Sequence, residues 1–228
     1  QDYDIQQVFF AVHNYPQDKM RAIYEKLNKA GIKVKNYDIP HMTSGGEKPQ
    51  LKEFEIEDLL FRRQESIINE KINAYYRGKT VLITGGGGSI GSELCRQIAR
   101  MTPKKIIILD IYENSAYDIQ QELKMKYGNK LDLSVEIVSI TNKKGLGRVF
   151  ETYSPDIVIN AAAHKHVPLM EHNCIEAVEN NVFGCLNIIE LCEEYGVSRF
   201  MMVSTDKAVN PTNVMGATKR TGEMIMLA

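Results

Sequence analysis

Short runs of apolar residues alternate with amphipathic stretches through the second two thirds of the chain. The apolar runs predict five strands, at Thr80 to Thr84, Lys105 to Asp110, Leu131 to Val138, Asp156 to Asn160 and Arg199 to Ser204. Apolar residues at helical spacing predict helices at Ser89 to Met101, Tyr117 to Tyr127, Gly147 to Tyr153, Cys174 to Tyr195 and Val214 to Leu227. We expect Ile90, Leu94 and Ile98 to share the apolar face of the first helix. Continuous apolar strands separated by helices predict an α/β fold with a parallel sheet covered on both faces.

The first part of the chain carries a smaller pattern of the same kind. Val8 to Val12 is an apolar run, Asp18 to Ala30 has helical spacing that Gly31 ends, and Ile32 to Tyr37 alternates like a strand. One β-α-β unit cannot bury both faces of its sheet alone. Thr43 to Gly46 reads as a linker, and the charged stretch Glu53 to Tyr76 as a helix. We therefore expect a partial small α/β domain at residues 1–45, a helical linker at 46–77 and the main α/β domain at 78–228.

Composition narrows the class of protein. Apolar residues make up 43% of the chain and charged residues 25%, as in soluble globular proteins. The net charge of -1 gives no sign of nucleic-acid binding. The sequence has no apolar run long enough for a membrane span, and its start lacks the basic region of a signal peptide. The four cysteines show neither a C-x-x-C pair nor zinc spacing, so we expect reduced core residues in a cytosolic compartment.

A glycine-rich turn follows the first strand of the main domain. Gly85, Gly88 and Gly91 have G-x-x-G-x-x-G spacing, with Ser89 and Ile90 between the last two. Glycine lets the chain turn tightly and bring its backbone against a diphosphate, and the helix start that follows offers free N–H groups to the anion. The strand before the turn and the helix after it are the context that this motif requires. The sequence therefore predicts a Rossmann-type doubly wound sheet that binds a dinucleotide.

The acid that ends the next strand bears on which dinucleotide is bound. A carboxylate at Asp110 would accept hydrogen bonds from the adenosine ribose hydroxyls and repel a 2′-phosphate. No arginine follows among Ile111, Tyr112, Glu113 and Asn114, so the sequence favours NAD over NADP. The alternative for Asp110 is an ordinary turn residue at a strand end.

The segment after the fourth predicted strand has small residues and a cation. Ala161, Ala162 and Ala163 would let a cofactor lie against the backbone, and Lys165 is placed to meet a phosphate or ribose hydroxyl. His164 and His166 lack companion carboxylates or cysteines at ligand spacing, so no metal is expected.

A hydroxyl, an acid and an amine stand together after the fifth predicted strand, at Thr205, Asp206 and Lys207. Ligands of open α/β sheets bind at the carboxyl ends of the strands, so these residues should face the site. Lys219 follows Met215 by one helical turn, on the same helix face. The alternative for the Thr-Asp-Lys segment is a capped helix start, and spacing alone does not decide between the two.

These motifs resemble those of one group of extended short-chain dehydrogenases/reductases, the CapD-like polysaccharide biosynthesis proteins. These are membrane-associated nucleotide-sugar 4,6-dehydratases of capsule, O-antigen and protein-glycan synthesis. The matching stretches are Thr84 to Leu94, Ala161 to Glu171, Asn181 to Gly184 and Ser204 to Arg220. The resemblance covers roughly residues 51 to 228, and the last stretch is long enough to be specific. The stretch before Thr43 is similar to the nucleotide-binding-like domain that precedes the catalytic domain in these proteins.

The resemblance implies a reaction and a role for each residue. NAD takes a hydride from C4 of a UDP-N-acetylhexosamine such as UDP-GlcNAc, water leaves across C5 and C6, and the hydride returns to C6. Lys207 would remove the C5 proton, Asp206 would protonate the departing hydroxyl, and Thr205 would hold the C4 hydroxyl. Lys219 would bind the nicotinamide ribose and supply positive charge to the site.

Five further residues extend the cofactor site that the resemblance implies. Glu113 and Asn114 would lie beside the adenosine, and Asn181 would lie near the cofactor. The third strand ends without the Asp often found beside adenine, so Ser139 and Ile140 are assigned that contact.

Met215 replaces the tyrosine that most of the superfamily uses in its Y-x-x-x-K pair. Methionine cannot carry a proton. The CapD-like group resembles this Met-x-x-x-Lys form, so the C4 hydroxyl proton would leave through Asp206 or a water.

The resemblance also implies that the sequence is a fragment. It predicts membrane helices upstream, a later sugar-binding part, a location at the cytoplasmic face of the cell membrane, and a homo-oligomer. We expect this piece to bind NAD better than sugar. Two alternatives stay open: a UDP-sugar epimerase or 4,6-dehydratase/5-epimerase, and a non-catalytic NAD-binding sensor or scaffold.

Overall fold

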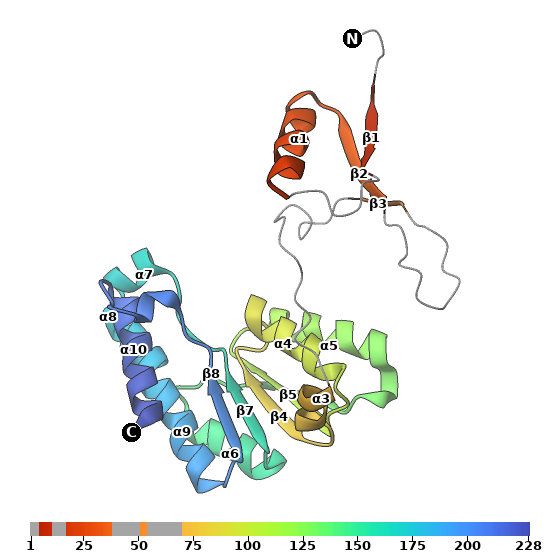
Figure 1. Cartoon of the computed structure of the whole chain (residues 1–228). Helices are drawn as coiled ribbons and strands as arrows, with labels where there is room; N and C mark the ends of the chain where they lie inside the picture. Colours follow the sequence, from red (N-terminus) through yellow and green to blue (C-terminus); the bar gives the residue numbers. More distant parts are fainter. Residues whose placement is uncertain (1–4, 11–16, 38–50, 54–69) are drawn as a thin grey trace. The chain divides into compact units, whose positions relative to one another are not determined.

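The computed structural model describes residues 5–10, 17–37, 51–53 and 70–228. The chain divides into two compact units, Gln1–Ile67 and Ile68–Ala228. Each unit has its own sheet (Figure 1).

The first unit contains the predicted β-α-β arrangement. Strand β1 (Gln7–Phe10), helix α1 (Gln17–Lys29) and strand β2 (Lys33–Tyr37) follow one another, and the two strands pair in parallel. The end of the predicted first strand, residues 11 and 12, lies outside the described residues. Gly31 ends the helix with a φ of 72°, a left-handed conformation that glycine adopts without strain.

The expected helical linker begins with a strand instead. Strand β3 (Leu51–Glu53) pairs antiparallel with β2, with Glu53 opposite Lys35. A strand of three residues is too short for periodicity to reveal it. Helix α3 (Glu70–Tyr76) forms the other end of the predicted stretch. Residues 54–69 and the predicted linker turn at 43–46 lie outside the described residues.

The second unit confirms the doubly wound parallel sheet. Its five strands are β4 (Thr80–Thr84), β5 (Lys105–Asp110), β6 (Leu133–Ile137), β7 (Ile157–Asn160) and β8 (Arg199–Met202). They pair in parallel in the order β6-β5-β4-β7-β8. The chain therefore runs outward from β4 to one side and then returns to build the other side. This reversal leaves a crevice at the carboxyl ends of β4 and β7, where ligands of such sheets bind.

Helices cover both faces of this sheet, as Figure 1 shows. Their bounds are α4 (Ser89–Ala99), α5 (Glu113–Tyr127), α6 (Lys143–Tyr153), α7 (Val167–His172), α8 (Cys174–Val178), α9 (Gly184–Glu194) and α10 (Val214–Leu227). Short turns η1 (Gly128–Lys130), η2 (Glu179–Phe183) and η3 (Asp206–Ala208) join some of them.

Alternate residues of the central strands enter two separate cores. Val81 and Ile83 pack with residues of α4 and α5, whereas Leu82 between them packs with residues of α6 and α9. Side chains of a strand point alternately to its two faces, so a strand buried on both faces is apolar throughout. Among the described helices, none is long and apolar enough to cross a membrane.

Several helix bounds differ from the prediction. Helix α6 begins at Lys143 rather than Gly147, because the Asn142 side chain caps it by accepting a hydrogen bond from the Gly145 N–H at 2.9 Å. Helix α5 begins at Glu113 rather than Tyr117. The predicted helix Cys174 to Tyr195 is interrupted by the π-helical turn η2, which carries Asn180 and Asn181.

Two side chains expected in the core lie at the surface. Cys174 is exposed, whereas Cys95, Cys185 and Cys192 are buried, and all four are free thiols. Ile90, in the first turn of α4, is 57% exposed, whereas Ile98 is buried.

Candidate functional site

The glycine turn between β4 and α4 is built for close backbone approach. Gly85 has a φ of 65°, and a Cβ there would lie 2.7 Å from the Ala162 backbone. A Cβ at Gly91 would lie 2.0 Å from the Gly85 carbonyl oxygen. No side chain caps the start of α4 at Gly88. The turn therefore needs glycine for its own packing and presents an open helix N-terminus, which attracts anions.

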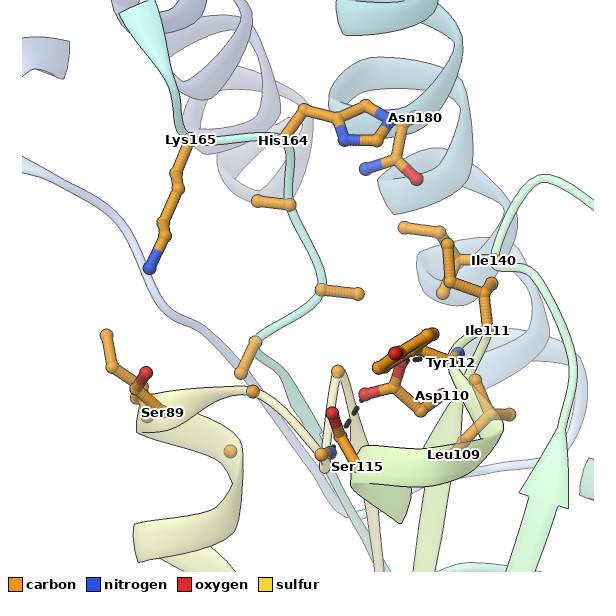
Figure 2. Close-up of a pocket in the computed structure, with 18 of the residues that line it drawn as sticks. Ser89, Leu109, Asp110, Ile111, Tyr112, Ser115, Ile140, His164, Lys165 and Asn180 are labelled. Carbon is orange, nitrogen blue, oxygen red and sulfur yellow. Dashed lines mark hydrogen bonds between the residues drawn. The ribbon is translucent and has the colours of Figure 1, made fainter. Parts of the chain in front are cut away.

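Asp110 connects this turn to the end of β5. One carboxylate oxygen accepts a hydrogen bond from the Gly87 N–H at 2.8 Å, and the other accepts one from the Tyr112 N–H at 3.0 Å. Figure 2 shows the carboxylate between these two backbone groups. Asp110 therefore does stabilise the turn at the end of β5, as the alternative interpretation holds. The carboxylate also lines the cavity described next, with lone pairs left for further donors.

A cavity of about 650 Å³ lies at the carboxyl ends of the three central strands. Eleven of the predicted cofactor residues line it: Gly85, Gly88, Ser89, Ile90, Gly91, Asp110, Ile140, Ala161, Ala162, Ala163 and Lys165. Its lining is mainly glycine, alanine and isoleucine, with Asp110 at one part and Lys165 at another (Figure 2). A cavity lined by small side chains, with an open helix N-terminus, a carboxylate and a cation, suits a dinucleotide.

The loop after β7 is fixed by two buried amides. The Asn160 Oδ1 accepts hydrogen bonds from the Thr84 hydroxyl at 2.7 Å and the Ala162 N–H at 3.2 Å, which joins the ends of β4 and β7. Asn181 holds the loop further on, because its side chain bonds both the N–H and the C=O of His164, at 2.8 and 3.0 Å. These contacts keep the alanine wall of the cavity in place.

Five residues expected at the cofactor do not line the cavity. Glu113 and Asn114 are exposed in the first turn of α5. Ser139 bonds Thr141 at 2.8 Å. Asn181 is buried behind the loop after β7, and the Lys219 amine bonds the Val203 carbonyl at 2.6 Å. Asn181 thus shapes the wall from behind.

Sequence reasoning missed other residues that line the cavity. Tyr112, Ser115 and Asn180 contribute polar groups to it. Tyr112 and Ser115 flank the start of α5. A helix start directly after the strand that ends at Asp110 is the sequence signal for both residues. Asn180 faces the cavity because η2 is a π-helical turn, which apolar periodicity does not reveal. Among the described residues, no cluster of three or more His, Cys, Asp or Glu side chains could hold a metal.

Thr205, Asp206 and Lys207 form a hydrogen-bonded group just after β8. The Asp206 carboxylate accepts hydrogen bonds from the Thr205 hydroxyl at 3.0 Å and the Lys207 amine at 3.1 Å. These bonds, that from Lys207 first, lower the pKa of Asp206. Thr205 also caps η3, because its hydroxyl oxygen accepts from the Lys207 N–H. The capping interpretation is correct for Thr205, and it leaves the acid and the amine exposed side by side.

Helix α10 places the last two predicted residues in buried surroundings. Met215 is 4% exposed and packs with Met170 and Ala177 in a small apolar cluster. Lys219 is 6% exposed, and this burial lowers the pKa of its ammonium group. The structure thus presents Met215 as a packing residue and Lys219 as a desolvated cation beneath the end of β8.

Comparison with known proteins agrees with this architecture. Residues 81–228 match the family model described as polysaccharide biosynthesis protein. The chain is 44% identical over 226 residues to the capsular polysaccharide biosynthesis protein CapD of Staphylococcus aureus, covering 98% of the chain and 38% of CapD. It is 35% identical over 154 residues to a UDP-N-acetylglucosamine 4,6-dehydratase (inverting) of Campylobacter jejuni, covering 67% of the chain and 44% of that protein.

The fold is similar to solved structures as well. The crystal structure of Pen from Bacillus thuringiensis superposes with a TM-score of 0.62 at 32% identity, covering 66% of the chain and 46% of Pen. The chain spans less than half the length of each of these proteins. The match to the family model extends over more than half of the chain, from β4 to the end of α10. The chain therefore belongs to the polysaccharide biosynthesis protein family.

Proposed function

We propose that the protein is an NAD-dependent nucleotide-sugar 4,6-dehydratase that acts on a UDP-N-acetylhexosamine in surface polysaccharide synthesis. The observation that carries the proposal is the Thr205–Asp206–Lys207 group, which stands at the carboxyl edge of the same sheet as the dinucleotide cavity. The relatedness to CapD and to the C. jejuni dehydratase supports both the substrate class and the pathway.

The cavity fits NAD by three features of its own residues. Gly85 and Gly91 leave the backbone accessible to a diphosphate, and a Cβ at either position would clash with backbone atoms. Asp110 can accept hydrogen bonds from ribose hydroxyls and would repel a 2′-phosphate. Lys165 supplies a positive charge at the loop after β7. Bound NAD would supply the hydride acceptor and donor that the protein side chains lack.

The Asp206–Lys207 ion pair after β8 contains the two kinds of group, an acid and an amine, that loss of water requires. Dehydration needs a base for the C5 proton and an acid for the C6 hydroxyl. The two side chains form an exposed ion pair, in which the amine donates to the carboxylate, and this is the reverse of those roles. A sugar that covers the pair would exclude water and favour its neutral form, because burying two charges is costly. Transfer of one proton from Lys207 to Asp206 then creates the base and the acid together. The C4 hydroxyl proton would leave through a water, because Met215 cannot accept it, and a proton from solvent would restore the ion pair at the end of the cycle.

The acid–amine pair bears on the choice between dehydration and epimerisation. The exposed pair has no function in 4-epimerisation, which leaves C5 and C6 unchanged. The buried thioether of Met215 cannot take the C4 hydroxyl proton, which both reactions must remove, so Met215 does not separate them. The pair therefore favours the dehydratase over the epimerase.

The direct test is incubation of the full-length protein with NAD and UDP-GlcNAc, followed by detection of the 4-keto chromophore in alkali and by NMR of the product. We expect a 4-keto-6-deoxy sugar, with solvent deuterium at C5. Substitution Asp206→Asn should abolish this product and leave NAD binding unchanged, because Asp206 lies outside the cavity lining. NAD binding without turnover of several UDP-hexosamines would favour a sensor instead, and D206N turnover at the wild-type rate would refute the role of Asp206.

A further inference from the structure

Helix α10 contacts the segment after β8 at three positions, one on each of three successive helical turns. Gly216 packs against the backbone of Lys207, where a Cβ would lie 2.3 Å from the carbonyl oxygen. One turn later Lys219 donates a hydrogen bond to the Val203 carbonyl at 2.6 Å. One more turn along, the Glu223 carboxylate accepts a hydrogen bond from the Ser204 hydroxyl at 2.5 Å. The first residues after β8 are therefore held by a single helix face.

Glu223 is itself held in a defined orientation. Its second carboxylate oxygen accepts a hydrogen bond from Arg220 Nη1 at 2.8 Å, three residues earlier on the same helix. The side chain of Glu223 is only 22% exposed. The hydrogen bond from Ser204, followed by that from Arg220, lowers the pKa of Glu223, so the carboxylate is ionised at neutral pH. An ionised acceptor with both oxygens engaged makes a strong and directional contact with a hydroxyl.

The acid–amine pair has little packing of its own. The side chains of Asp206 and Lys207 are 85% and 49% exposed, and they bond to each other. Their location is therefore set by the direction in which the backbone leaves β8. Ser204, which Glu223 holds, directly precedes Thr205 and is the last residue before the group.

We propose that Glu223 is a positioning residue, which through Ser204 fixes the chain leaving β8 and so places the Asp206–Lys207 pair against the sugar. This inference rests on the proposed dehydratase function of that pair. The sequence predicts neither Ser204 nor Glu223 as a site residue, because Glu223 lies one helical turn beyond the Met215–Lys219 motif.

The test uses the full-length protein and four variants. Glu223→Ala removes the acceptor, Ser204→Ala removes the donor, and Glu223→Gln retains an acceptor oxygen of similar shape. Glu194→Ala, at an exposed acid in the last turn of α9, is the matched control. We expect E223A to lower kcat for dehydration by about ten- to hundredfold, the scale of misplacing a reacting group by about 1 Å. NAD affinity should stay unchanged, because the cavity is built on β4, β5 and β7.

Two further comparisons separate positioning from a general loss of structure. E223Q should recover most of the lost kcat, and the S204A/E223A double variant should be no slower than the slower single variant, because both act through one contact. A kcat for E223A equal to that of E194A would overturn the proposal, as would additive losses in the double variant.

Failure of the proposed function would leave the positioning role testable. If the wild-type protein forms no 4-keto product from any UDP-hexosamine, the dehydratase assignment is refuted. Amide hydrogen exchange of residues 203–209 then decides the role of Glu223. Faster exchange in E223A than in E194A supports the positioning contact, and equal exchange in the two variants overturns it.

Discussion

The substitution Gly91→Ala tests whether the glycine turn is the dinucleotide cradle. An added Cβ would lie 2.0 Å from the Gly85 oxygen and 2.8 Å from the Gly86 Cα, both backbone atoms. Real Cβ atoms essentially never come within 3.0 Å of another heavy atom, so the turn must move by at least about 1 Å. A shift of this size takes the backbone N–H groups out of hydrogen-bonding reach of a diphosphate, since N–H···O bonds span about 2.7–3.2 Å. Loss of two charge-assisted bonds, at about 1.5–3 kcal/mol each, corresponds to at least a hundredfold weaker binding.

The assay is calorimetric titration with NAD, with thermal unfolding measured in parallel. Gly147→Ala is the matched control, because a Cβ there would meet only the Leu191 Cδ2, at 3.9 Å, inside helix α6. We expect G147A to keep its NAD affinity and to gain about 0.5–1 kcal/mol of stability, the usual difference between glycine and alanine within a helix. A G91A protein that binds NAD within about twofold of wild type would refute the assignment of the turn.

Two further substitutions address cofactor choice and acid stability. Asp110→Asn removes the charge that repels a 2′-phosphate, so we expect NAD to bind about tenfold more weakly and the preference over NADP to shrink; an unchanged ratio of the two dissociation constants would contradict this. Asp156 accepts a hydrogen bond from the Thr80 N–H at 2.8 Å, which with its Lys79 partner lowers its pKa below 3.8. Its stabilising effect is therefore complete above pH 3.8 and is lost as the pH falls through the lower pKa of the folded state. Asp156→Asn should cost about 1 kcal/mol in urea unfolding at neutral pH and reduce the dependence of stability on acid pH; equal acid dependence of the two proteins would argue against it.

The strongest sequence signals were those with a fixed local geometry. The continuous apolar strands predict the sheet, and the glycine spacing together with Asp110 predicts the cavity, because each signal is a pattern of residue types at a fixed spacing along the chain. Features that depend on contacts between distant parts of the chain could not be predicted from the sequence. Asn180 enters the cavity through an irregular turn, Asn181 braces a loop seventeen residues earlier in the chain, and Met215 lies in an apolar cluster formed by separate helices. Such placements depend on tertiary packing, which periodicity does not encode.

The π-helical turn η2 has a consequence for anyone who aligns or edits this region. A π-helical turn carries one more residue than an α-helical turn, and each residue of an α-helix turns by about 100°. Removal of one residue between Glu179 and Phe183 would restore an uninterrupted helix of nearly the same length. The residues on either side would keep nearly their present faces, because the π-helical turn absorbs its extra residue locally, but Asn180 and Asn181 could not both keep their places. A one-residue deletion at this point would therefore alter the wall of the cavity more than the packing of the flanking helices.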